Sequence, residues 1–426
     1  MLMKRLFLIL PVLMFLLVSC SNDDDVAQNN AQGVVRYMLP ETRDITLTAN
    51  QRSIMKANTK FAFDLMRNIN VINEANGNKD RSVFVSPFGV ATMLGMIYNG
   101  ADDDVRTQIA QTLHLDNYAV DDVNGYFKKL LTEIPEADAS VKVGMANALL
   151  VNKQYTIDPQ FAAVAADSYG AKVASMDFDS PSTTQEVNHW ASDKTHGLIN
   201  NVVESVDADV AAYLFNSMCF VANWTKQFDR ENTTTETFTS ENGATTNVSM
   251  MHNRACILAC ANDYCSAIKL PYGGKAWNMM VILPNKGVTI KDVLDNITPD
   301  FLHHTQFYEM VLDLSLPKFE FTDKEDLYKV MKNMGLGMLF DEGRLTRLCA
   351  DGKLHVSDMW QQSKISVSEE GTKATAVTMS EMFFDADGGG MLDALKDGFN
   401  ANRSFLYIVY ESTSFVPVFI GTFNGK

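Results

Sequence analysis

The chain has 426 residues, 46% of them hydrophobic, and carries a formal net charge of −16 at pH 7. A charge of this sign and size opposes binding to nucleic acid and to an anionic membrane surface. The hydrophobic content is enough for a substantial core, and no repeat or change of composition divides residues 50–426, so one large domain is favoured over two.

The N-terminus has the pattern of a targeting segment. Residues 1–19 are expected to be a signal peptide, because a basic head precedes the apolar run Leu6–Val18, which is too short to span a membrane. The run ends at Cys20 in a pattern typical of a lipobox, which predicts that Cys20 is lipidated and becomes the mature N-terminus. A plain secretory signal or a core helix is the alternative. Residues 21–25 resemble the acidic tag of surface lipoproteins in Gram-negative bacteria, which predicts an outer-membrane lipoprotein, periplasmic or exterior, attached to the membrane through its lipid.

The remaining chain divides into a tether and a folded domain. Residues 20–48 are polar and aperiodic, as expected of a flexible tether, and residues 49–426 are expected to fold. Helical periodicity comes first and strand-like runs follow, which favours the α+β class. The predicted helices span residues 50–74, 87–99, 103–113, 120–132, 158–170 and 183–196. The predicted strands span residues 212–222, 264–270, 277–283, 308–318, 354–368, 405–411 and 416–423.

The cysteines do not indicate a disulfide scaffold or a metal site. With Cys20 lipidated, an odd number remains. Cys256, Cys260 and Cys265 lie close together, but His252 is the only nearby histidine and a zinc site needs four well-spaced ligands. A bridge between Cys260 and Cys265 stays open beside the favoured reading of buried thiols. No metal and no other cofactor is expected.

Enzyme motifs are missing from the sequence. It contains no Gly-x-Ser-x-Gly, no His-Glu-x-x-His, no P-loop and no Gly-x-Gly-x-x-Gly, and its seven histidines are scattered. The sequence therefore predicts a protein that is not an enzyme.

The segment Glu369 to Thr378 has the pattern of a buried strand in an unusual place. From Thr372 on, every second residue is small and uncharged, so the segment could enter a sheet with this set facing inward. It is nevertheless followed by residues 385–390, whose Asp and Gly residues are typical of an exposed loop. The alternative is an ordinary strand followed by a linker.

Two strings flanking this loop resemble those of one family. Glu369-Glu370-Gly371-Thr372 resembles the hinge of the serpins, and Phe399 to Ile408 is similar to the signature after their reactive loop, with Ser404 in place of the usual Pro. Other serpin-like strings follow in order along residues 50–426. They are Val83 to Phe88, Asn147 to Val151, Tyr169 to Ala171, Asn188 to Trp190, Lys194 to Gly197, Leu214 to Asn216, Trp224, Met250 to His252, Leu270 to Tyr272, Leu283-Pro284 and Leu316 to Phe319.

The resemblance implies the serpin fold and activity. It implies helices around a large mixed five-stranded sheet, two smaller sheets, and an exposed reactive loop at about residues 371–398. It also implies a monomer that traps a serine or cysteine endopeptidase covalently, because the cleaved loop inserts into the sheet beside residues 354–368 and carries the acyl-enzyme along. About twelve new backbone hydrogen bonds, at about 0.5–1.5 kcal/mol each, contribute on the order of 10 kcal/mol, so the uncleaved fold must be kinetically trapped.

The same resemblance assigns roles to residues. The hinge is expected at Glu369, Glu370, Gly371, Thr372, Ala374 and Ala376. An ion pair between Lys318 and Glu369 is expected at the top of the sheet, with two solvated surface charges as the alternative. Ser86 and Asn216 match the shutter, the cluster where the sheet opens, while Gly89 and Gln361 stand where the family usually has Ser and His.

The position of the cut and the function have alternatives. Family spacing puts the scissile bond between Asp385 and Ala386, and Phe384 is the alternative residue to be cut after. Thr372 and Ala374 are small enough to insert, which favours an inhibitor over a non-inhibitory serpin acting as a binding or protective surface protein. A nutrient-binding surface lipoprotein is the alternative from another class.

Overall fold

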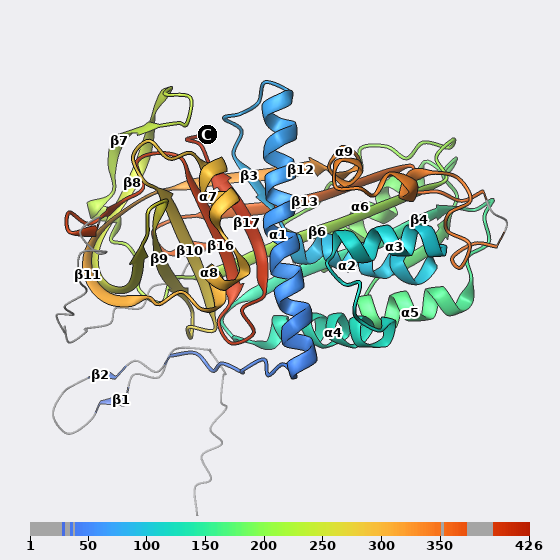
Figure 1. Cartoon of the computed structure of the whole chain (residues 1–426), viewed down its shortest axis with the longest axis horizontal. Coiled ribbons are helices and arrows are strands. Elements are labelled where there is room, and N and C mark those ends of the chain that lie inside the picture. The colour runs from blue at the N-terminus through green and yellow to red at the C-terminus, as the bar shows by residue number, and fades with distance from the viewer. Residues whose placement is uncertain (1–27, 30–34, 37–38, 351–352, 373–394) are drawn as a thin grey trace, which may run out of the picture. The chain divides into compact units, whose positions relative to one another are not determined.

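The structure is a computed structural model that describes residues 28–29, 35–36, 39–350, 353–372 and 395–426 (Figure 1). The chain forms two compact units, residues 1–38 and residues 39–426. In the first unit β1 (Gln28–Asn29) pairs antiparallel with β2 (Val35–Arg36). All other elements belong to the second unit.

The six predicted helices are present in the second unit, with ends within two residues of the expected ones. They are α1 (Ala49–Ala75), α2 (Pro87–Gly100), α3 (Asp103–Thr112), α4 (Val120–Glu133), α5 (Pro159–Tyr169) and α6 (Ser182–Lys194). Three short helices were not predicted, because one or two turns leave no readable period. They are α7 (Ile290–Asn296), α8 (Pro299–His303) and α9 (Leu327–Asn333).

One sheet corresponds to the large mixed sheet expected from the sequence. Its strand order is β12-β13-β6-β4-β5, and a further two-residue strand, β14, pairs with β6. The strands are β12 (Phe319–Asp326), β13 (Asp358–Val367), β6 (Ala212–Asn223), β4 (Lys142–Asn152), β5 (Lys172–Met176) and β14 (Gly371–Thr372). β13 begins at Asp358, not at Leu354 as predicted, because residues 353–357 are irregular.

The other strands, expected as two smaller sheets, are connected in one nine-stranded sheet. Its order is β15-β11-β8-β9-β10-β16-β17-β3, with β7 paired to β8. The strands are β3 (Val83–Val85), β7 (Thr234–Thr239), β8 (Thr245–Ala261), β9 (Cys265–Tyr272), β10 (Trp277–Pro284), β11 (Tyr308–Pro317), β15 (Phe399–Asn400), β16 (Phe405–Glu411) and β17 (Pro417–Phe423). β8 joins the two expected sheets, because its 17 residues pair with β7, β11 and β9 at different points.

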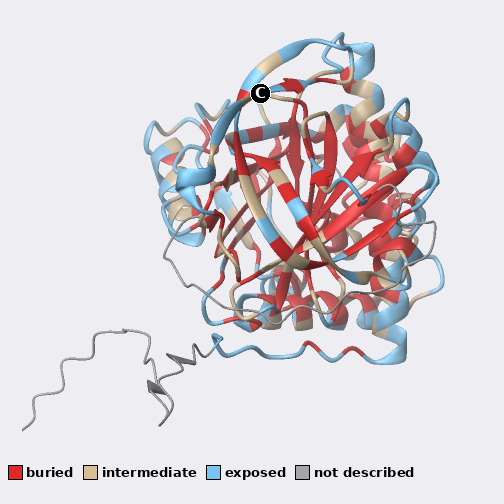
Figure 2. Ribbon diagram, turned by 90° about the vertical axis from the view of Figure 1, so that its left-hand side faces the viewer, coloured by how far each residue is buried: buried red, intermediate tan, exposed pale blue. Residues whose placement is uncertain are grey.

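The middle strands of the six-stranded sheet, β6 and β4, are buried on both faces, and Figure 2 shows buried strands in the interior. Leu214 and Met218 of β6 belong to the main core, which also contains α2. Phe215 and Cys219, of the opposite parity on β6, belong to a second cluster with Val187 of α6. Side chains of alternate parity therefore face α2 on one side of the sheet and α6 on the other.

Residues 39–48 correct the predicted extent of the tether. Ile45 and Leu47 are buried, and the Ile45 amide donates to Thr413 Oγ1 at 2.8 Å. This segment packs on the rest of the second unit, because it offers two apolar side chains and pairs its backbone. Within the described ranges, every helix is too short or too polar to cross a membrane.

A buried ion cluster ties the start of β3 to β12, at the edge of the six-stranded sheet. Arg81 donates to Glu325 Oε2 at 2.7 Å and also pairs with Asp323, which accepts from the Phe84 amide at 2.9 Å. Both carboxyl groups are at least nine-tenths buried. Burial raises the pKa of Glu325 to about 7, although the Arg81 charge opposes the shift.

The shift of Glu325 predicts a pH dependence of stability. A carboxyl group whose pKa rises on folding stabilises the fold most below its ordinary value, 4.5, and this contribution is lost as the pH rises through about 7. Between pH 5 and pH 8 the native protein should therefore lose about 2 kcal/mol relative to Glu325→Gln. Denaturant midpoints at the two pH values measure the loss. Glu320→Gln, on the exposed face of β12, is the control. If the free energy of unfolding changed equally between pH 5 and pH 8 in the native protein and in Glu325→Gln, the prediction would be contradicted.

Candidate functional site

The chain reverses direction at the top of the six-stranded sheet, immediately after β13. Ser368 and Gly371 exchange two backbone hydrogen bonds, of 2.9 and 3.1 Å, so Glu369 and Glu370 form a two-residue turn. Gly371 has φ +126°, and a Cβ there would lie 2.5 Å from the Ala222 carbonyl oxygen. Only glycine fits this backbone and this close approach to β6.

The reversal places β14 against β6 at the point where β6 and β13 separate. β13 runs parallel to β6 and pairs with it from Asp358 opposite Tyr213 to Lys364 opposite Cys219. Above that point β14 pairs antiparallel with β6, with Gly371 opposite Asn223 and Thr372 opposite Ala222. The first two residues of the predicted loop therefore already occupy a strand position in the sheet.

Backbone and indole donors hold the turn in place. The Trp224 amide donates to the Glu370 carbonyl oxygen at 2.9 Å, the Trp224 indole donates to the Ser368 carbonyl oxygen at 2.9 Å, and the Phe228 amide donates to the Glu369 carbonyl oxygen at 2.8 Å. Trp224 itself stacks on Tyr272, with ring centroids 4.2 Å apart. The turn is thus fixed by rigid aromatic residues that follow β6.

Lys318 and Glu369, which the sequence predicts to be paired, lie 2.9 Å apart between Nζ and Oε2. Glu369 is 4% exposed and also accepts a hydrogen bond of 2.9 Å from the Thr233 hydroxyl. Burial alone would raise the pKa of Glu369, but the bonds from Lys318 and Thr233 outweigh it and hold the pKa below its usual value. The carboxylate stays charged and anchored at neutral pH.

The predicted shutter residues come together at the middle of the sheet, where α2 begins beneath it. Gln361 of β13 accepts from the Ser86 amide at 2.6 Å, and its Nε2 donates to the Ser86 carbonyl oxygen at 3.0 Å and to Asn216 Oδ1 at 2.7 Å. Asn216 Nδ2 on β6 in turn donates to Asn147 Oδ1 on β4 at 2.6 Å. All four side chains are buried and none of them titrates, so this cluster provides no pH gate.

Gly89 is explained by the size of Gln361. A Cβ on Gly89 would lie 2.3 Å from Asn216 Oδ1 and 2.7 Å from Gln361 Nε2. The space that a serine side chain would need is therefore filled by the glutamine and asparagine amides. The two departures from the family pattern, at Gly89 and Gln361, compensate each other.

Several predicted site residues lie outside the described residues. They are Cys20, Ala374, Ala376, Phe384, Asp385 and Ala386, and for Thr372 only the backbone is described. Thr233, which supports Glu369, had no signal in the sequence, and Trp224 and Asn147 stood out only as family strings. Their contacts join segments far apart along the chain, which local patterns do not reveal.

The described residues hold no group of three or more His, Cys, Asp or Glu side chains placed to bind a metal ion. Cys260 and Cys265 are buried free thiols, and burial raises the pKa of each to about 12. Neither thiol is suited to act as a nucleophile at neutral pH.

The compensation at the shutter can be tested by refilling the site. Gly89→Ala should lower stability by about 1–3 kcal/mol, because the added methyl group collides with Asn216 and Gln361. Thermal unfolding midpoints measure the effect. The matched control is Gly125→Ala in α4, where an added Cβ meets nothing within 4 Å and alanine favours the helix. If both variants are equally stable, the cluster does not restrict position 89.

Comparison with known proteins gives a consistent assignment. The family model described as Serpin (serine protease inhibitor) matches residues 56–425. A serpin-like protein of Thermococcus kodakarensis is 28% identical, and the match covers 90% of this chain and 88% of that protein. Human leukocyte elastase inhibitor is 27% identical, and the match covers 87% of this chain and 99% of the inhibitor. Among solved structures, the thermophilic serpin tengpin in its native state has a TM-score of 0.75 and 22% identity, over 90% of this chain and 96% of its own. Human thyroxine-binding globulin with thyroxine has a TM-score of 0.77 and 23% identity, over 88% and 98%. The chain belongs to the serpin family.

Proposed function

We propose that this serpin inhibits a serine or cysteine endopeptidase by offering the loop of residues 371–398 for cleavage and then inserting it between β13 and β6. The observation that carries the proposal is β14, whose two residues pair with β6 where β13 and β6 separate. Serpin loop insertion is an established case of strand addition. The similarity to leukocyte elastase inhibitor also supports an inhibitory role.

The strand registers support insertion without any sliding of the sheet. Six places beyond Thr372, a continued ladder would bring residue 378 opposite Asn216 on β6. Continuing the Ser368–Gly371 pairing brings the same residue opposite Gln361 on β13. Asn216 and Gln361 are already partners in the closed sheet, so the two strands need only separate sideways. Separation would break the hydrogen bond between Gln361 and Asn216, and the Thr378 hydroxyl group would take its place.

The same register supports the inward placement of the small residues. Directly opposed residues of antiparallel strands point to the same face. Ala374 and Ala376 would therefore lie beside Phe220 and Met218, which face the main core. Residues of the other parity would face the α6 side, where Val377 would lie opposite Ser217.

The length of β6 supports a cut near residue 385. Ten places beyond Thr372, residue 382 would pair with Ala212, the first residue of β6. A cut after Phe384 or Asp385 leaves two or three residues beyond the sheet, so the whole inserted segment finds partners. A cut near Met391 would leave about nine unpaired residues between the sheet and the trapped protease, at an extended length of about 30 Å. The shorter overhang holds the protease against the end of the sheet.

The first prediction of this proposal concerns insertion. Cleavage of the loop should raise the unfolding midpoint by more than about 10 °C, because a new central strand adds backbone bonds. Thr372→Arg should leave cleavage intact but convert the inhibitor into a substrate, since continued pairing with β13 would bring residue 372 opposite the buried Val367 and enclose the charge between two strands. Gel analysis for a denaturant-resistant complex, over a panel of proteases, measures both effects, and Thr372→Ser is the control. An unchanged midpoint after cleavage would favour the non-inhibitory binding or protective role.

The second prediction concerns specificity. If Asp385 precedes the scissile bond, the target must offer a basic pocket, whereas a cut after Phe384 suits a chymotrypsin-like pocket; a papain-like protease would accept either register. Asp385→Ala should abolish inhibition of an acid-specific protease but spare inhibition of a chymotrypsin-like one. Mass spectrometry of the released C-terminal peptide identifies the cut. The peptide should begin at Ala386 in the first case and at Asp385 in the second. A peptide beginning near Met391 would contradict both registers.

We also propose that Cys20 carries a lipid that holds the inhibitor at the outer membrane or cell surface. The lipobox pattern of residues 17–20 and the charge of −16 support a lipid rather than an electrostatic anchor. Cys20→Ala should abolish acylation and release or stall the protein, and membrane fractionation with mass spectrometry of the N-terminus measures this. Cys349→Ala is the control for loss of a cysteine elsewhere. Acylated Cys20→Ala protein in the membrane fraction would refute the assignment.

A further inference from the structure

A cavity of about 80 Å³ lies where β8 and β9 separate. β8 pairs with β9 only over Leu258–Ala261, but it pairs with β11 over Met250–Ala259. Beside the gap, the Thr225 amide donates to the Pro271 carbonyl oxygen at 2.9 Å, so the chain that follows β6 lies against β9 where β8 has left it. The cavity is the space between this segment and β8.

The interior of the cavity is apolar. Six of the lining residues are buried members of the main core: Trp224, Phe228, Ala255, Ile257, Leu270 and Leu314. The volume is close to the share of about three water molecules in the liquid, and it is well below the volume of about 150 Å³ of an engineered cavity that binds benzene. The cavity therefore suits a chain of about three aliphatic carbon atoms and is too small for a ring.

The charged side chains at the cavity are basic. Lys226 and Lys275 line it, and among the described residues no Asp or Glu does. Lys275 is exposed, and within the described ranges its ammonium group has neither a hydrogen-bond acceptor nor an ion-pair partner. In a chain with a net charge of −16, a cavity lined by cations and no carboxylate favours an anionic ligand.

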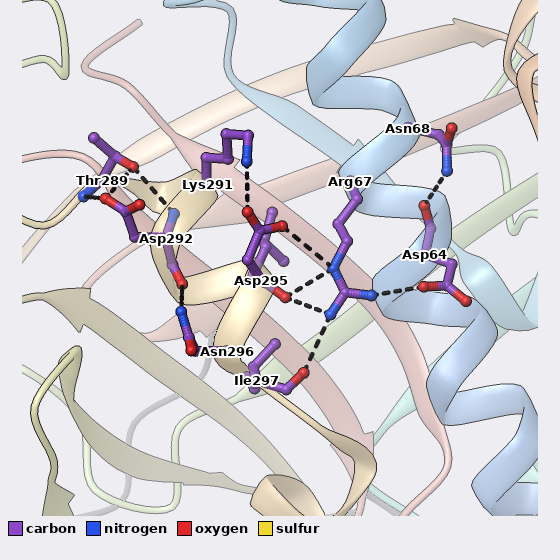
Figure 3. A network of polar contacts seen from close by, with 10 residues as sticks. Asp64, Arg67, Asn68, Thr289, Lys291, Asp292, Asp295, Asn296 and Ile297 are labelled. Carbon is purple, nitrogen blue, oxygen red and sulfur yellow. Dashed lines mark hydrogen bonds and ion pairs between the residues drawn. The ribbon is translucent and has the colours of Figure 1, made fainter.

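The cavity between α1 and α7 differs in this respect, as Figure 3 shows. There Arg67 donates to Asp64 at 2.6 Å, and Lys291 donates to Asp295 at 2.5 Å. Neighbouring carboxylates neutralise both cations, so neither is left to attract an anion. Lys291 is therefore a matched control for Lys275.

Two residues of the cavity wall also hold the hinge turn. The Trp224 amide donates to the Glu370 carbonyl oxygen, and the Phe228 amide donates to the Glu369 carbonyl oxygen. The rings of Trp224 and Phe228 meet edge to face, with centroids 6.4 Å apart. A group that packs against either ring therefore restricts the segment that anchors the hinge.

We propose that this cavity binds a short aliphatic carboxylate such as butyrate. The three-carbon tail packs against Trp224, Phe228 and Leu270, and the carboxylate accepts from the ammonium group of Lys275. The site is present in the uncleaved protein and does not depend on inhibition of a protease.

Probes of one shape with different head groups test the charge, by titration calorimetry and ligand-observed NMR on the uncleaved full-length protein. Butyrate should bind with a dissociation constant of about 1–10 mM. Butyramide, which is uncharged, should bind about 5-fold more weakly, and butylamine should bind at least about 10-fold more weakly. Butylamine binding as tight as that of butyrate, or no saturable binding of butyrate, would overturn the proposal.

A chain-length series tests the size of the cavity. Each buried methylene group should strengthen binding about 4-fold, so butyrate should bind about 15-fold more tightly than acetate. Octanoate should gain little over butyrate, because its further carbon atoms extend into solvent. If the affinity kept rising about 4-fold per carbon as far as octanoate, the tail would lie on an open surface and the proposal would be wrong.

Variants place the binding in this cavity. Lys275→Gln should weaken butyrate binding about 5-fold and leave butyramide binding unchanged, whereas Lys291→Gln should change neither. Ala255→Leu should fill the cavity and abolish binding of both probes, and its thermal unfolding midpoint shows whether it folds. Full butyrate binding by Lys275→Gln would place the carboxylate elsewhere and refute the assignment, whether or not Ala255→Leu folds.

The hinge provides an independent measurement. Bound butyrate should slow hydrogen exchange at the Trp224 and Phe228 amides at least about 2-fold, because it packs against the rings of both residues. Exchange at the amides of α7, beside the other cavity, should stay the same. Saturation with butyrate without any change at the Trp224 and Phe228 amides would show that the ligand does not contact this wall.

Discussion

The pairing of β13 with β6 is the contact on which the rest of this structure depends. These two central strands run parallel, with only seven opposed pairs, and the shutter amides of Gln361 and Asn216 bridge them at mid-length. Parallel pairing is slightly less stable per residue than antiparallel pairing. An inserted strand antiparallel to both would exchange one parallel ladder for two antiparallel ones. On the proposed mechanism, cleavage of the loop would therefore give the sheet access to a more stable arrangement.

The shutter is a neutral cluster that stabilises the pairing of β13 with β6. Gln361 reaches across from β13 to bond both Ser86 and Asn216, and Gly89 leaves the room that its longer side chain needs. Because buried amides are costly to leave unpaired, separating β13 from β6 must break bonds that only an incoming polar group can replace. On the proposed mechanism, the hydroxyl group of residue 378 would supply such a polar group.

Much of the fold could be predicted from local patterns, and the exceptions have physical causes. The long helix α1 follows from the periodicity of its apolar residues, and α2 was also predicted as a helix although it is buried on nearly every side. β8 could not be foreseen, because a 17-residue strand that changes partners along its length shows no constant alternation. At the site, the serpin-like string Glu369 to Thr372 predicted a hinge, and the structure has a turn at Glu369 and Glu370. The support of Glu369 by Thr233 depends on tertiary contacts, which the sequence does not display.

The anchored hinge also bears on the speed of insertion. Forming a new strand usually requires closing a loop first, and the entropic cost of this closure precedes the formation of any backbone hydrogen bond. Here the turn at Glu369 and Glu370 is already closed, held by Trp224 and Phe228, and β14 already pairs with β6. Insertion can then proceed by adding pairs one after another to an existing ladder. On the proposed mechanism, the remaining barrier would be the separation of β13 from β6 at the shutter, so the shutter residues, as well as the hinge, should affect the rate of insertion relative to hydrolysis of the acyl-enzyme.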